Sequence, residues 1–214
     1  MKTSKIKMSI VVLLIVLSIT GQEIRSNEVV TITGRHIKKR IKHAEKFSSF
    51  FHKNVDELVE ILPPTTHRDY TSLKPTNFRK VRLKSRTGYY LEVLNSGKVA
   101  GNTIETNYSV LEMQVIAPQI KRIKSVLTGK YISINSDGKV KTKTNISPDI
   151  YFIEEVLPHS FYSYFSIKYP KSTKEPPWLL GLKQKVGNKS YGVACRASRT
   201  LPGDNETQFS IIDF

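Results

Sequence analysis

From about residue 80 to the C-terminus, short apolar runs alternate with turns that contain glycine and asparagine. Apolar runs of about four to eight residues bounded by such turns are typical of β-strands rather than helices. The pattern therefore predicts an all-β domain made of many short strands.

The strand pattern repeats along the chain. Three segments recur with an offset of 40 to 41 residues, so that 82–85, 88–93 and 97–99 return as 122–125, 129–134 and 138–140. A more divergent third copy comprises residues 166–168, 178–182 and 187–189. Three copies of a four-stranded unit are typical of a β-trefoil. A β-propeller has blades of similar length, but it needs about four of them to close.

Each repeat holds apolar residues that a single unit could not bury alone. In the first two copies these are Tyr90, Leu91 and Val93 and their counterparts Tyr131, Ile132 and Ile134. We expect them to converge on one axial core shared by the three units.

The N-terminus has a different pattern. An apolar run over residues 8–19 follows three lysines and precedes Gly21, which is the organisation of a signal peptide. The run is shorter than the roughly 20 residues that cross a bilayer as a helix. We therefore expect a signal peptide over residues 1–21 and a secreted, extracellular chain without stable membrane insertion. An uncleaved signal anchor is the alternative.

Between residues 37 and 62, apolar residues recur at spacings of three and four, and Pro63 and Pro64 follow. This spacing predicts an amphipathic helix. Its basic first half could bind polyanions or dock on the main domain, and a solvated or processed extension is the alternative. The predicted organisation is a signal peptide (1–21), a basic extension (22–78) and a β-trefoil domain (79–214).

Charge narrows the class of partner. The formal net charge is +16, and it falls to +13 when the three leader lysines are removed. A charge of this size predicts attraction to polyanions. Outside the cell the abundant polyanions are sulfated polysaccharides, so the leader argues against a nucleic acid partner.

Cysteine and asparagine add two expectations. Cys195 is the only cysteine, so the domain must be held by its core rather than by an internal disulfide, and a thiol that pairs between chains is the alternative to a buried one. N-glycosylation is expected at some of four Asn-x-Ser/Thr triplets. These begin at Asn107, Asn145, Asn188 and Asn205.

The chain lacks the residue patterns of an enzyme. Four of the five histidines lie in the N-terminal extension, and no Gly-x-Ser-x-Gly, phosphate-loop or His-Glu-x-x-His motif occurs. One cysteine gives no metal-ligand spacing. We therefore predict no catalytic residue, no metal site and no cofactor.

Several motifs resemble the fibroblast growth factor core in order and spacing. They comprise residues 86–94, 97–101, 108–115, 129–134, 138–140, 161–164 and 178–182. The resemblance covers about residues 80–214. Interleukin-1-like cytokines, plant protease inhibitors and ricin-type lectins share the trefoil, but those lectins usually repeat Gln-x-Trp, and Trp178 is the only tryptophan here. The resemblance implies a paracrine ligand of a receptor tyrosine kinase with heparan sulfate as co-ligand.

The resemblance also implies a receptor-binding surface. Its residues would be Leu83, Glu154, His159, Phe161, Ile212 and Phe214. Leu83 and Phe161 stand where the family usually has tyrosine, and His159 where it has asparagine. The two family cysteines are replaced, one by Lys84 and the other near Asp149 or Ile150. These departures leave the fold and class intact and leave the choice of receptor open.

The implied heparan-sulfate site is the loop after the third-unit strand together with one residue of the first hairpin. Its residues would be Arg86, Lys183, Gln184, Lys185, Lys189, Arg196 and Arg199. Clustered lysine and arginine can converge on sulfates, arginine in a bidentate manner. The segment 193–205 is longer than usual, and a glycan at Asn188 would crowd it.

Two functions therefore follow from the sequence. The expected one is a growth factor that activates a receptor of the fibroblast growth factor receptor class, with heparan sulfate or heparin, and is held near matrix polysaccharide. The alternative is a secreted heparin-binding module or a cytokine-like ligand that activates no receptor kinase.

Overall fold

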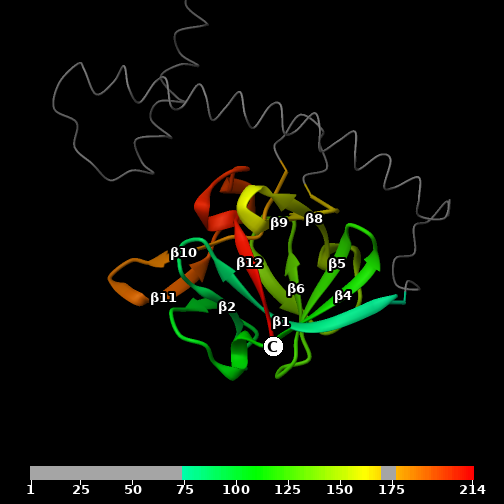
Figure 1. The fold of residues 1–214 in the computed structure, drawn as a ribbon, viewed down its shortest axis with the longest axis horizontal. Helices are drawn as coiled ribbons and strands as arrows, with labels where there is room; N and C mark the ends of the chain where they lie inside the picture. The colour runs from blue at the N-terminus through cyan, green and yellow to red at the C-terminus, as the bar shows by residue number, and fades with distance from the viewer. Residues whose placement is uncertain (1–73, 170–176) are drawn as a thin grey trace, which may run out of the picture. The chain divides into compact units, whose positions relative to one another are not determined.

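The computed structural model describes residues 74–169 and 177–214 of the chain (Figure 1). The predicted signal peptide (1–21) and amphipathic helix (37–62) lie outside these residues. Among the described residues, no helix has the length and apolar character needed to cross a membrane.

The described residues form twelve strands in three units of four. The first unit contains β1 (Asn77–Ser85), β2 (Tyr90–Val93), β3 (Val99–Asn102) and β4 (Leu111–Ala117). The second contains β5 (Ile120–Ser125), β6 (Tyr131–Ile134), β7 (Val140–Lys143) and β8 (Tyr151–Leu157). The third contains β9 (Phe161–Ser166), β10 (Leu182–Lys185), β11 (Asn188–Ala194) and β12 (Phe209–Asp213).

Six of these strands close into a barrel. Antiparallel pairs run β1–β4, β4–β5, β5–β8, β8–β9, β9–β12 and β12–β1. The other six strands form three hairpins, β2–β3, β6–β7 and β10–β11, one in each unit. Figure 1 shows β12 lying along β1, where the last strand meets the first. A six-stranded barrel with three hairpins is a β-trefoil, which confirms the predicted fold class.

Equivalent residues of the three units fill one core. Leu91, Ile132 and Leu180 belong to the same cluster and are fully buried, and so are Val93, Ile134 and Leu182. Each such side chain stabilises the fold by about 1.5–3 kcal/mol through removal of apolar surface from water. Because Cys195 is a free and buried thiol, this packing takes the place of a disulfide in the described residues.

The expectation for two tyrosines was wrong. Tyr131 packs in a second cluster with Ile150 and Tyr151 rather than in the axial core. Tyr90 belongs to a polar network on the outside of the barrel. The reason is strand geometry, since successive side chains point to opposite faces and Tyr90 and Tyr131 each precede an inward residue.

Glycines in the hairpin turns of the three units share one backbone conformation. Gly97, Gly138 and Gly187 adopt the left-handed backbone conformation, with φ of 80°, 72° and 78°. Gly138 is also closely packed, because an added Cβ would lie 2.5 Å from Ser198 Oγ. Its carbonyl oxygen accepts a hydrogen bond from Ala197 N at 2.7 Å, which ties the second unit to the segment after β11.

Replacing Gly138 should therefore cost more than replacing a turn glycine in open space. Gly138→Ala should lower the free energy of unfolding by about 2–4 kcal/mol, combining backbone strain with overpacking. Gly129→Ala is the matched control, because Gly129 has φ of 68° and no atom within 4 Å of the added Cβ. The control should lose only about 1–2 kcal/mol in chemical denaturation. Equal losses of unfolding free energy in the two variants would show that close packing against Ser198 does not contribute to the cost.

Candidate functional site

The pairing of β1 with β12 builds one outer surface from the two ends of the domain. Arg82 lies opposite Ile212, and Leu83 lies opposite Ile211. Leu83 is fully buried in the core, so its side chain offers no surface to a partner. The outward position beside it is held by Lys84, because alternate residues of a strand face opposite sides.

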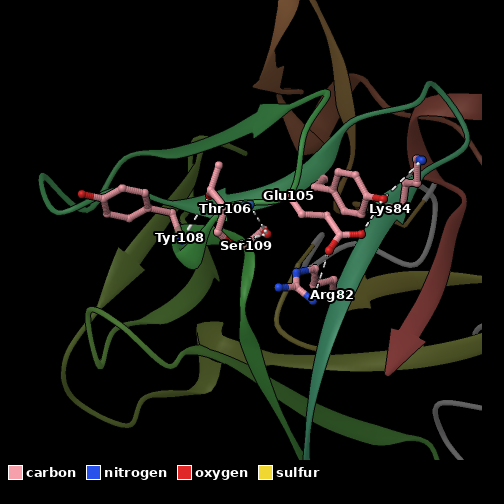
Figure 2. A network of polar contacts seen from close by, with 7 residues as sticks. Arg82, Lys84, Glu105, Thr106, Tyr108 and Ser109 are labelled. Atoms are coloured by element: carbon pink, nitrogen blue, oxygen red, sulfur yellow. Dashed lines mark hydrogen bonds and ion pairs between the residues drawn. The ribbon is translucent and has the colours of Figure 1, made fainter. Parts of the chain in front are cut away.

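A polar network orders this surface, and Figure 2 shows Glu105 lying between Arg82 and Lys84. Arg82 Nη1 lies 3.3 Å from Glu105 Oε2, and the hydroxyl of Tyr90 donates to Glu105 Oε1 at 3.0 Å. Lys84 Nζ donates to the Tyr90 hydroxyl at 3.4 Å. Arg82 also stacks on the ring of Phe214, 4.6 Å from its centre. The network therefore holds the last residue of the chain, which is 63% exposed, against β1.

The loop that supplies Glu105 is itself ordered by a capping box (Figure 2). Thr106 accepts a hydrogen bond from Tyr108 N at 3.2 Å, and the Ser109 hydroxyl both accepts from Thr106 N and donates to Thr106 O. The Thr106 hydroxyl also donates to the Glu92 carboxylate. Burial raises the pKa of Glu92, and the hydrogen bond from Thr106 opposes that shift. Glu105 is thus presented from a fixed loop.

The β8–β9 hairpin carries the other residues expected at the receptor surface. Glu154 lies 3.5 Å from Lys121 Nζ and accepts a hydrogen bond from the Tyr164 hydroxyl at 3.1 Å. Burial, reinforced by the negative charge of Glu154, raises the pKa of Tyr164. At the tip, the non-glycine residues His159 and Ser160 have φ of 62° and 61°. Left-handed backbone at such residues is uncommon and gathers at functional sites.

Phe161 joins this hairpin to the turn between β1 and β2. The Arg86 guanidinium stacks on the Phe161 ring, 5.2 Å from its centre, and Arg86 Nη1 donates to Gln208 Oε1 at 2.8 Å. The structure therefore places Arg86, expected at the polyanion site, in contact with Phe161, expected at the receptor site. The two surfaces expected from the sequence would therefore adjoin at Arg86 and Phe161.

A small cleft of about 200 Å³ lies beside the same contact, and its lining includes Arg86, Glu155, His159 and Gln208. Burial raises the pKa of Glu155 to about 7. Glu155 Oε2 is buried and has no hydrogen-bond partner among the described residues. A carboxyl group in this state accepts a proton far more readily than one in water.

The residues expected to bind heparan sulfate are all exposed. Lys183, Gln184 and Lys185 lie on β10, which pairs with β11, where Lys189 lies. Thr87 Oγ1 donates to Leu182 O at 3.1 Å and so brings the β1–β2 turn beside β10. Arg196 and Arg199 follow β11, and Arg199 N donates to Arg196 O at 2.8 Å. Apart from Arg86, whose side chain is turned toward Phe161, these residues therefore lie on β10, on β11 and in the segment after β11.

Two acidic residues, Asp204 and Glu206, follow Arg199 in the chain. The pKa of Cys195 is raised to about 12, mainly by burial and also by the charges of Glu206 and Asp204, while Lys183 opposes the shift. The carboxylates of Asp204 and Glu206 therefore lie close enough to Cys195 to influence its electrostatics. Neither residue belongs to the set that the family resemblance implies for polyanion binding.

Three of the glycosylation triplets begin with an exposed asparagine. Asn107, Asn145 and Asn205 are exposed, while Asn188 is half-buried and accepts a hydrogen bond from Ser190 N at 2.9 Å. The described residues contain no group of histidine, cysteine or acidic side chains that could hold a metal ion.

Sequence reasoning missed Lys84, Tyr90, Glu105 and Glu155 as parts of these surfaces. The strict alternation of β1 was available in the sequence, since the apolar residues Val81 and Leu83 fix Lys84 on the opposite face. The role of Glu105 depends on a contact between a loop and a strand, and local pattern does not encode such a contact.

The Glu155 carboxyl generates a pH prediction. Because its pKa is raised when folded, its contribution to stability is lost as pH rises from about 4.5 to about 7. Glu155→Gln should therefore be more stable than the wild type at about pH 8, by about 1–2 kcal/mol after solvent screening. Near pH 4 the two proteins should have similar stability. A pH-independent difference in denaturant midpoints would contradict the assignment.

Comparison with known proteins identifies the family. The sequence profile of the family described as "Fibroblast growth factor" matches residues 79–210. Fibroblast growth factor 7 of Ovis aries is 31% identical over 148 residues, which are 68% of this chain and 72% of the relative. A putative fibroblast growth factor 1 of Danio rerio is 31% identical over 97 residues, or 45% and 63% of the two chains. Fibroblast growth factor 4 of Gallus gallus is 31% identical over 83 residues, or 39% and 43%.

The matched residues extend over nearly the whole six-stranded barrel and its three hairpins, from β1 into β12. The residues that match the family profile are therefore the residues that form the β-trefoil. The chain belongs to the fibroblast growth factor family and is a growth factor rather than an enzyme.

Proposed function

We propose that the chain is a secreted paracrine ligand that binds and activates a receptor tyrosine kinase of the fibroblast growth factor receptor class, with heparan sulfate as co-ligand. The observation that carries the proposal is the exposed apolar surface on the closing strands. The Phe214 ring packs against the Arg82 guanidinium, and Ile212 of β12 lies opposite Arg82 in the sheet. Ordered aromatic and aliphatic anchors beside an arginine are the usual composition of an interface hot spot.

The receptor surface proposed here includes Glu154, His159, Phe161, Ile212 and Phe214. Lys84 takes the place of the buried Leu83 in this proposal, because its side chain faces outward and is braced by Tyr90. A lysine at this position favours an acidic group on the receptor, whereas an apolar residue would favour an apolar contact. The receptor patch opposite β1 should therefore carry a carboxylate.

The proposed heparan-sulfate surface comprises Arg86, Lys183, Gln184, Lys185, Lys189, Arg196 and Arg199. Support comes from their common exposure and from the contact that brings the β1–β2 turn beside β10. Binding to the polysaccharide would retain the secreted protein near the matrix. Its affinity should fall as salt rises, because exposed ionic contacts are screened.

Direct binding tests the proposal. The purified mature protein should bind a fibroblast growth factor receptor ectodomain, and heparin should tighten that binding. If the protein is retained on heparin but does not bind the receptor, whether or not heparin is added to the receptor assay, the alternative of a matrix-held heparin-binding module is favoured. Absence of binding to both would overturn the proposal as a whole.

The aromatic anchor at the C-terminus yields a sharper prediction. Phe214→Ala should weaken receptor binding by about tenfold, the loss expected of a well-packed interface aromatic. The measurement is surface plasmon resonance with immobilised receptor ectodomain. Leu127→Ala is the control, because Leu127 is also exposed, at 51%, and lies after β5, outside the proposed surface. An equal affinity for both variants would remove Phe214 from the receptor surface.

A further inference from the structure

A larger cleft lies between the three units, outside the receptor surface. Its volume is about 800 Å³, and it is lined by residues 96–99 of the first unit, 139–142 of the second and 193–196 of the third. We refer to it as the inter-unit cleft. A volume of this size accommodates a small organic ligand or a short stretch of a polymer.

The charge of the inter-unit cleft is one-sided. Its lining holds four cationic side chains and no carboxylate: Lys98, Lys139, Lys141 and Arg196. All four are exposed. Lys139 Nζ lies 3.9 Å from the Asp137 carboxylate, while Lys98 and Lys141 form no ion pair within the described part of the chain. Cations gathered in a concave surface focus a positive potential on it.

The backbone around these cations is ordered by contacts between the units. Thr142 Oγ1 donates to Gly97 O at 2.8 Å, and Lys130 Nζ donates to Asn95 O at 3.2 Å. Arg196 Nε donates to Asp137 O at 2.9 Å, which orients its guanidinium. Fixed donors of this kind lose less freedom when a ligand binds.

Apolar residues form another part of the lining, namely Val99, Val140, Val193, Ala194 and Cys195. An ionic contact made against such a surface is stronger than one made in open water, because the local dielectric constant is lower. The cleft is therefore suited to clustered anionic groups rather than to a cation or an apolar ligand.

Arg196 connects the cleft to the polyanion surface proposed above. It belongs to that surface and also lines the cleft, and Val193 of the cleft pairs with Lys183 of the surface. We propose that the inter-unit cleft is a second sulfate-binding subsite, through which one sulfated saccharide chain continues from the third unit onto Lys98, Lys139 and Lys141. This inference rests on the proposed heparan-sulfate role and extends it to residues of the first two units.

Three variants, each lacking two charges, test the subsite in the full mature protein. The cleft variant is Lys98→Gln with Lys141→Gln, the surface variant is Lys185→Gln with Lys189→Gln, and the control is Lys74→Gln with Lys80→Gln. All six lysines are exposed, and thermal unfolding should give the same midpoint for the three proteins as for the wild type. Isothermal titration with a heparin oligosaccharide of defined length at several salt concentrations gives the affinity and the number of ionic contacts.

The cleft variant should bind heparin about tenfold more weakly than the control, with a shallower salt dependence by roughly one to two contacts. Bound oligosaccharide should also protect Lys141 from acylation in the wild type. Equal affinity and equal salt dependence of the cleft variant and the control would overturn the subsite. Displacement of the oligosaccharide by a poly-glutamate peptide at similar concentration would also overturn it, in favour of an acidic peptide ligand.

The results that would refute the heparan-sulfate role differ from those that would refute the second subsite. If neither the wild type nor any variant binds heparin at moderate salt, the heparan-sulfate role itself is refuted. If the surface variant loses affinity while the cleft variant matches the control, the co-ligand role stands and the second subsite is refuted. If both variants lose affinity, the saccharide contacts both regions.

Discussion

Closure of the barrel by β1 and β12 is the constraint on which the remaining structure depends. The register aligns Val81 with Asp213 through Ser85 with Phe209, so the last strand of the domain completes the sheet begun by the first. Phe209 then packs against Tyr164 inside the barrel, with ring centres 6.1 Å apart. Because Cys195 is a free thiol, hydrophobic packing and these ladders hold the described domain together without a disulfide.

The same closure produces the exposed face of the domain. Once inward positions of β1 and β12 are filled by Leu83 and Phe209, the intervening residues must face solvent, and Arg82 and Ile212 stand opposite each other. Arg82 can then reach both Phe214 and Glu105. Core packing and the proposed receptor surface are therefore two consequences of one strand register, and a slip of one residue would exchange them.

The sequence predicted the elements that depend on local pattern. The 40-residue repeat predicted the trefoil, and the equivalent turn glycines Gly97, Gly138 and Gly187 confirm the assignment of the third copy. The direction of side chains was harder to predict, since Tyr90 and Tyr131 were expected in the axial core and lie outside it. The candidate site was predicted least well, because the stacking of Arg86 on Phe161 and the cleft beside Glu155 arise from segments far apart in the chain.

We propose that this member of the fibroblast growth factor family signals through a receptor kinase and needs a sulfated polysaccharide to do so. The most direct measurement is receptor tyrosine phosphorylation in cells that express a fibroblast growth factor receptor but make no heparan sulfate, treated with the purified mature protein. We expect little phosphorylation with the protein alone and a strong increase when heparin is added. An absence of phosphorylation with heparin present, for a protein that still binds heparin, would contradict it.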